Sequence, residues 1–73
     1  MALTPSQADA LRALARSPGA TASEVAASTG LPAKGTAWNL SELSGRGLVE
    51  IEAGGTRYAL TPRGLRTLEK LGQ

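Results

Sequence analysis

Few side chains in this sequence could carry out covalent or metal chemistry. The chain has no cysteine and no histidine, which argues against a disulfide framework, a thiolate or imidazole metal site, and a catalytic dyad or triad built on either residue. Its six Asp and Glu residues are scattered, and no two converge at a spacing typical of acid and base catalysis. We therefore expect no enzymatic activity, no cofactor and no bound metal.

The side chains suited to binding are basic or face outward. Eight Lys and Arg against six Asp and Glu give a formal net charge of +2, and the sequence pI is about 9.7. This mild basicity is compatible with a nucleic-acid partner. The single Trp lies in the segment KGTAWNLSEL. On a helical wheel centred on Leu40, at about 100° per residue, Trp38 lies about 160° away, in an arc shared with Lys34 and Ser41.

Three interpretations of Trp38 follow from this outward position. The indole could fold over a neighbouring hairpin or helix flank, because Trp is usually mostly covered in folded proteins. It could contact DNA, through a thymine methyl group, a sugar or a phosphate. It could also lie in an interface with another protein or with a second copy of the chain.

The helices that must position these residues are marked by their caps. The segments Thr4–Gln7 and Thr21–Glu24 have the pattern of a capping box, in which a hydroxyl and a longer polar side chain satisfy free amides at a helix start. They predict helices over about 5–16 and 22–29. A third helix, predicted over about 32–44, follows after a tight turn. Two short helices joined in this way are typical of a helix-turn-helix unit.

Beyond the third helix the hydrophobic period changes from helical to alternating. The segments LVEIE and TRYAL predict two strands of a hairpin within about 48–60. Gly54 and Gly55 match a two-residue primed turn, which needs positive φ at both positions. The resulting register predicts two cross-strand pairs: Ile51 with Tyr58 on the inner face, and Glu52 with Arg57 on the outer face.

A last helix is predicted to begin after Thr61 with Pro62. The fold class is therefore mainly α with a small β-hairpin (α+β), in one domain over residues 1–73 and in the order helix, helix, helix, hairpin, helix. The buried stripe of the last helix is predicted to be Leu65, Leu68 and Leu71. The predicted core consists of Ala8, Leu11, Leu14, Val25, Leu31, Leu40, Leu43, Leu48, Val49, Ile51, Tyr58, Leu60, Leu65 and Leu68.

The length also bears on partners and location. A single core of this size supplies only about 3–5 kcal/mol of stability, so that a homodimer would help. The first 30 residues show no signal-peptide pattern, and no apolar run approaches the roughly 18 residues that span a bilayer. We expect a soluble, cytoplasmic protein that does not bind a membrane.

Three stretches follow one another along the chain: GATASEVAASTGLPAKG, LSELSGRGLVE and YALTPRGLRTLEKL. Their order and spacing resemble a winged helix-turn-helix domain, in particular that of the MarR-like prokaryotic transcriptional regulators. The resemblance implies a recognition helix over about 32–44 that enters the DNA major groove, and a wing over about 48–60. It further implies that the protein binds double-stranded DNA, as a dimer, and regulates transcription. The long terminal helices with which MarR-like proteins dimerise are not seen, so we expect no small-molecule ligand.

The candidate DNA contacts follow from this resemblance. The charge of Lys34 and the start of the third helix both favour a phosphate. Ala37 could meet a thymine methyl group, and Ser41 could hydrogen-bond a base edge. No Arg, Asn or Gln lies on this arc, so base specificity is expected to be modest or to come from DNA shape. The full set of candidates is Thr21, Ser23, Lys34, Ala37, Trp38, Ser41, Arg57 and Arg63.

Two other functions remain open for the same fold. One is a protein-interaction winged helix that uses the Trp38 face, which the weak net charge would suit. The other is recognition of left-handed DNA, because TGLPAKG followed by GLVE resembles the Z-DNA-binding winged helices. Those domains carry Lys, Asn and Tyr where this chain has Ala33, Ala37 and Ser41.

Overall fold

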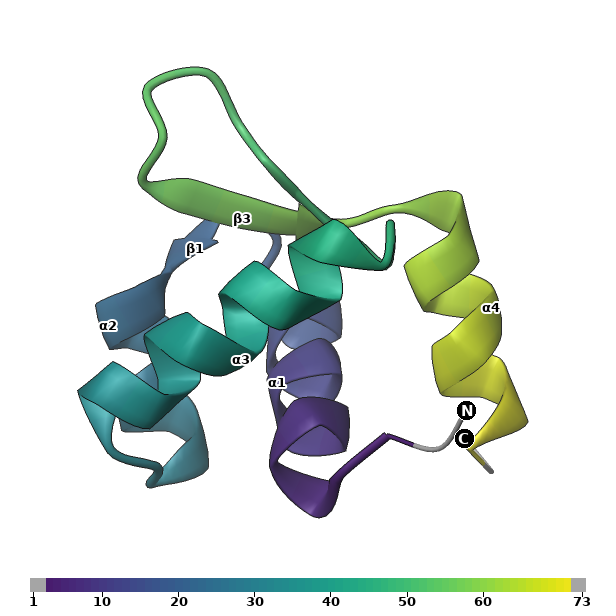
Figure 1. The fold of residues 1–73 in the computed structure, drawn as a ribbon, viewed down its shortest axis with the longest axis horizontal. Coiled ribbons are helices and arrows are strands. Elements are labelled where there is room, and N and C mark those ends of the chain that lie inside the picture. The colour runs from purple at the N-terminus through teal and green to yellow at the C-terminus, as the bar shows by residue number, and fades with distance from the viewer. Residues whose placement is uncertain (1–2, 72–73) are drawn as a thin grey trace.

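Four helices and a small antiparallel sheet make up the structure, a computed structural model that describes residues 3–71 (Figure 1). The sheet lies at one side of the molecule, and its hairpin projects beyond the helices. The elements in chain order are α1 (Pro5–Arg16), β1 (Ala20–Thr21), α2 (Ala22–Thr29), α3 (Ala33–Gly45), β2 (Val49–Ile51), β3 (Arg57–Leu60) and α4 (Pro62–Lys70). This α+β order confirms the predicted fold class.

Both predicted capping boxes are formed, which explains why α1 and α2 begin where the sequence predicts. The Thr4 hydroxyl accepts a hydrogen bond from the Gln7 amide at 3.2 Å, and the Gln7 side chain accepts one from the Thr4 amide at 3.2 Å. Thr21 and Glu24 make the same reciprocal pair, at 3.2 and 2.9 Å. Gly30, with φ of +75°, then ends α2 in the left-handed conformation that favours glycine.

The sheet contains one strand that was not predicted from the sequence. Its order is β1-β3-β2, so β3 is the central strand and pairs with β1 through Ala20 and Tyr58. A two-residue strand carries no detectable alternation, and β1 forms only because β3 supplies a partner.

The hairpin has the predicted register but a different turn. Ile51 pairs with Tyr58, as predicted, and the Glu52 amide donates to the Arg57 carbonyl at 2.8 Å. The turn hydrogen bond, however, runs from the Gly55 amide to the Glu52 carbonyl at 2.9 Å. The predicted two-residue turn is therefore wrong, and the wing tip is a loop over 53–56. Gly54 and Gly55 both have positive φ, as predicted, at +102° and +77°.

Leucines of α1 and α3 form the centre of the core, and Val25 of α2, Val49 of β2 and Leu68 of α4 pack around them. Leu11, Leu14, Leu40 and Leu43 are fully buried. Alanine fills four buried positions besides the predicted Ala8, because its small side chain lets neighbouring elements approach closely. The buried alanines absent from the predicted core are Ala10, Ala13, Ala20 and Ala26.

Three positions predicted to be buried, Ile51 and Leu65 of the predicted core and Leu71 of the predicted stripe on the last helix, are exposed. Ile51 is 47% exposed because it lies two residues further along the wing than the buried Val49, on the same face of the strand. Leu65 is 48% exposed, and Leu71 is also exposed. The reason is that α4 packs through Gly64 and Leu68, which turns Leu65 to the rim of the contact. Leu31, Tyr58 and Leu60, also predicted as core, are half-buried.

A close contact joins α4 to the root of the wing. The Thr61 hydroxyl accepts from the Gly64 amide at 3.0 Å and donates to the Gly47 carbonyl at 2.6 Å. The Thr61 amide donates to the Leu48 carbonyl at 3.1 Å. A Cβ at position 64 would overlap that same Leu48 carbonyl. Only glycine fits there without a backbone shift.

Within residues 3–71, no helix combines the length and apolar character needed to cross a membrane.

Gly64→Ala is expected to destabilise the domain by about 1–3 kcal/mol, the usual cost of forcing an extra carbon into a packed contact. Urea denaturation followed by circular dichroism measures this. The matched control is Gly45→Ala, also in a helix but with open space around its Cβ position. It should leave stability unchanged or raise it by less than about 1 kcal/mol. Equal stabilities of the two variants would contradict the described contact.

Candidate nucleic-acid interface

The helix α3 has one buried and one exposed side, as the helical wheel predicted. Thr36, Leu40 and Leu43 on its inner side are fully buried. Trp38, on the outer side, is 67% exposed. Because two thirds of its surface is free, packing against the wing or a helix flank does not account for Trp38. DNA and a protein partner remain as the two possible contacts.

The exposed side of α3 forms a shallow, open depression. Among the candidate residues, the structure brings four together here: Lys34, Ala37, Trp38 and Ser41. Pro32 and Gly35 complete the lining. Neither is among the candidates predicted from the sequence. Their positions near Lys34 could have identified them: Pro32 lies in the loop between α2 and α3, and Gly35 lies in the first turn of α3.

The start of α2 provides a second candidate surface. The Thr21 hydroxyl is used in the cap of α2, where it accepts from the Glu24 amide, and Thr21 is half-buried. Ser23 is exposed in the first turn. The carboxylate of Glu24 accepts from the Thr21 amide at 2.9 Å and so places a negative charge at this helix N-terminus, where it opposes a phosphate. Of the two residues, Ser23 is thus better placed for a DNA contact.

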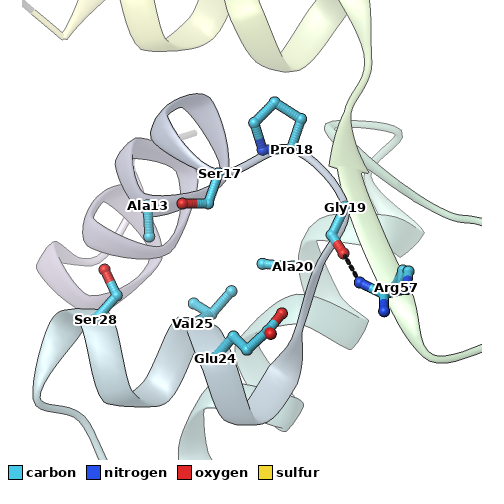
Figure 2. Close-up of a pocket in the computed structure, with 9 residues that line it drawn as sticks. All are labelled: Ala13, Ser17, Pro18, Gly19, Ala20, Glu24, Val25, Ser28 and Arg57. Atoms are coloured by element: carbon cyan, nitrogen blue, oxygen red, sulfur yellow. Dashed lines mark hydrogen bonds between the residues drawn. The ribbon is translucent and has the colours of Figure 1, made fainter.

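Arg57 is held by the loop that follows α1, and not by the predicted partner Glu52. Its Nη1 donates to the Gly19 carbonyl at 2.9 Å (Figure 2). Glu52 and Arg57 face each other across the hairpin as predicted, since the Glu52 amide donates to the Arg57 carbonyl. Within the described residues, however, their side chains form no ion pair. One N–H of the guanidinium is engaged and the others are free to donate. The hydrogen bond ties the start of β3, next to the wing-tip loop, to the loop that follows α1, while Arg57 stays exposed.

Arg57 also lines a surface cavity of about 330 Å³ between the end of α1, β1 and α2. Figure 2 shows the Glu24 and Arg57 side chains on the same side of this cavity, with Ser28 farther along α2. The cavity is lined by Ala13, Ser17, Pro18, Gly19, Ala20, Glu24, Val25, Ser28 and Arg57. It is separate from the depression on α3, because the two share no lining residue.

The charges of the candidate cations are not neutralised by contact. Across residues 3–71, the one ion pair joins Arg12 and Asp9, with 3.4 Å between Nη1 and Oδ1. Lys34, Arg57 and Arg63 are all exposed, and Arg63 lies in the first turn of α4, directly after the wing. Their charges are available to an anionic partner. Over the same residues, no group of three His, Cys, Asp or Glu side chains could hold a metal ion.

The sequence matches the family model described as the MarR family over residues 3–57. The chain belongs to the MarR family. Its helix-turn-helix (α2 and α3) and its wing (β2 and β3) are therefore those of a MarR-family winged helix, as predicted from the sequence. A search of curated proteins gave no match. Family membership does not favour the alternative of a protein-interaction module.

Solved structures of MarR-family proteins and related regulators superpose closely on this chain. The PcaV transcriptional regulator from Streptomyces coelicolor, in complex with its natural ligand, has 32% identity and a TM-score of 0.87, with 96% of this chain and 53% of that chain covered. The transcriptional repressor CouR, bound to p-coumaroyl-CoA, has 32% identity and a TM-score of 0.84, with 94% and 50% covered. A MarR family protein from Bacillus stearothermophilus has 25% identity and a TM-score of 0.85, with 97% and 52% covered.

The chain spans about half the length of these solved proteins. One of them was solved with its natural ligand and another with p-coumaroyl-CoA bound. Our expectation that this chain has no small-molecule ligand stays a prediction.

The exposure of Trp38 predicts a simple spectroscopic property. Because Trp38 is the only Trp and is 67% exposed, its fluorescence should have the emission of a hydrated indole. Acrylamide should quench it almost as efficiently as free N-acetyltryptophanamide. A blue-shifted emission with weak quenching would contradict the exposed position. Repeating the measurement over a range of protein concentrations tests whether self-association covers the indole.

Proposed function

We propose that this chain is a double-stranded DNA-binding domain that acts as a dimer in a cytoplasmic, prokaryotic transcriptional regulator. The observation that carries the proposal is the outward face of α3, where Lys34 and Trp38 are exposed on the second helix of a MarR-family helix-turn-helix. In such units this helix enters the major groove. The related PcaV and CouR are described as a transcriptional regulator and a transcriptional repressor.

In the proposed complex, phosphate contacts position the domain on the duplex. Lys34 lies in the first turn of α3, where its ammonium group and the helix N-terminus attract the same phosphate. Ser23 at the start of α2, Arg57 at the wing and Arg63 at the start of α4 supply further polar or basic groups. A dimer places two recognition helices one helical turn of DNA apart and selects a two-fold symmetric site. The mild net charge of +2 fits a few such contacts per copy.

Selection of bound sequences from a random duplex library, followed by fluorescence anisotropy at low salt, tests the proposal. We expect an enriched, two-fold symmetric site whose affinity falls steeply with salt concentration. Sedimentation velocity on the complex gives the number of copies bound. Failure to bind any duplex pool at micromolar protein and low salt would refute the proposed function.

Lys34→Gln should weaken binding to all duplexes by a similar factor, because a phosphate contact carries no sequence information. The plot of log affinity against log salt concentration should become shallower by about 0.9 for each phosphate that the variant no longer neutralises. The matched control is Lys70→Gln, which removes the same charge from the last turn of α4. An equal decrease of slope in both variants would show that Lys34 acts only through the net charge.

A further inference from the structure

The depression on α3 has few groups that could read bases by hydrogen bonds. Its lining contains neither the fork of an Arg nor the amide of an Asn or Gln. Asn39 is half-buried outside the lining, and the Glu42 carboxylate accepts a hydrogen bond from Gln7 Nε2 of α1 at 3.3 Å. What the depression offers is an apolar surface formed by Pro32, Ala37 and Trp38, with one hydroxyl and one ammonium group beside it.

Gly35, inside the same depression, is not required by the fold. It does not have positive φ, and a Cβ at this position would meet nothing within 4 Å. Glycine within a helix destabilises it relative to alanine, so no internal contact explains the choice. The missing side chain keeps the surface beside Trp38 open to a group that approaches from outside.

The edges of the four bases match this surface unequally. In the major groove, guanine is read best by Arg or Lys, adenine by the amides of Asn or Gln, and cytosine by the carboxylates of Asp or Glu. Thymine alone presents a methyl group, next to the O4 acceptor. Ala37 and Trp38 supply apolar contact for such a methyl, and the Ser41 hydroxyl can donate to O4. Lys34, the one group suited to guanine, lies in the first turn of α3, where a phosphate competes for it.

We propose that the outward face of α3 reads thymine through its 5-methyl group, with Trp38 and Ala37 as the residues in contact. The proposal rests on the DNA binding proposed above and names what that surface recognises. It predicts a site whose most specific positions are thymines facing the recognition helix. It also gives the exposed indole and the glycine beside it one common role.

Deoxyuridine, which is thymidine without the 5-methyl group, provides the test. Each thymine of the selected duplex is replaced singly, and affinity for the full chain is measured by anisotropy. At the thymines read by α3, removal of one buried methyl should weaken binding about fourfold. Deoxyuridine outside the site should have no effect. Trp38→Ala, which leaves only Ala37 beside the methyl group, should lose most of the difference between the thymine and deoxyuridine duplexes. The control Leu65→Ala, which changes an exposed apolar residue on α4, should keep the full difference.

The outcomes separate this proposal from the proposed function. Binding that is insensitive to deoxyuridine at every position overturns thymine reading and leaves DNA binding in place. A Trp38→Ala variant that keeps the sensitivity, or that is impaired only in self-association, overturns the role given to Trp38. Absence of binding to any duplex overturns both proposals. The deoxyuridine series with the unmodified protein tests thymine reading even if a variant fails to fold. Circular dichroism checks that each variant is folded.

Discussion

Burial of one side of α3 is the constraint on which the rest of the structure depends. Thr36, Leu40 and Leu43 are fully buried, and the two leucines join the helix to the core of α1. A helix with 3.6 residues per turn cannot bury this side without presenting the opposite one. Trp38 is therefore exposed as a direct consequence of core formation. The neighbouring elements, which are the capped helices α1 and α2 and the wing, then determine which residues lie beside this exposed side.

Much of this arrangement could be predicted because it depends on local signals. The capping boxes at Thr4 and Thr21 determine two helix starts, and the wheel places Trp38 outside. The strand β1, the wing-tip turn and the hydrogen bond from Arg57 to Gly19 could not be predicted. The strand and the hydrogen bond depend on contacts between segments far apart in the sequence. The prediction that Leu65 is buried was wrong for the same reason, since the close fit of Gly64 to Leu48 sets the rotation of α4 about its axis.

The candidate surface differs from a simple basic patch. Lys34 supplies charge, but the groups beside it are short or apolar, and the indole is the largest of them. Phosphate contacts give affinity without sequence information, whereas contacts with base edges give specificity. The family assignment supplies the expectation that α3 faces DNA. The chemistry of the exposed side chains then decides which bases it can distinguish.

The outward side of α3 is the proposed DNA-binding surface of this chain. Amide chemical shifts of the ¹⁵N-labelled chain, followed by NMR during titration with the selected duplex, test it most directly. We predict that the largest changes lie over residues 33–41, with smaller ones in the first turn of α2 and at the wing tip. Changes concentrated in the last turns of α4, with α3 unaffected, would contradict the claim.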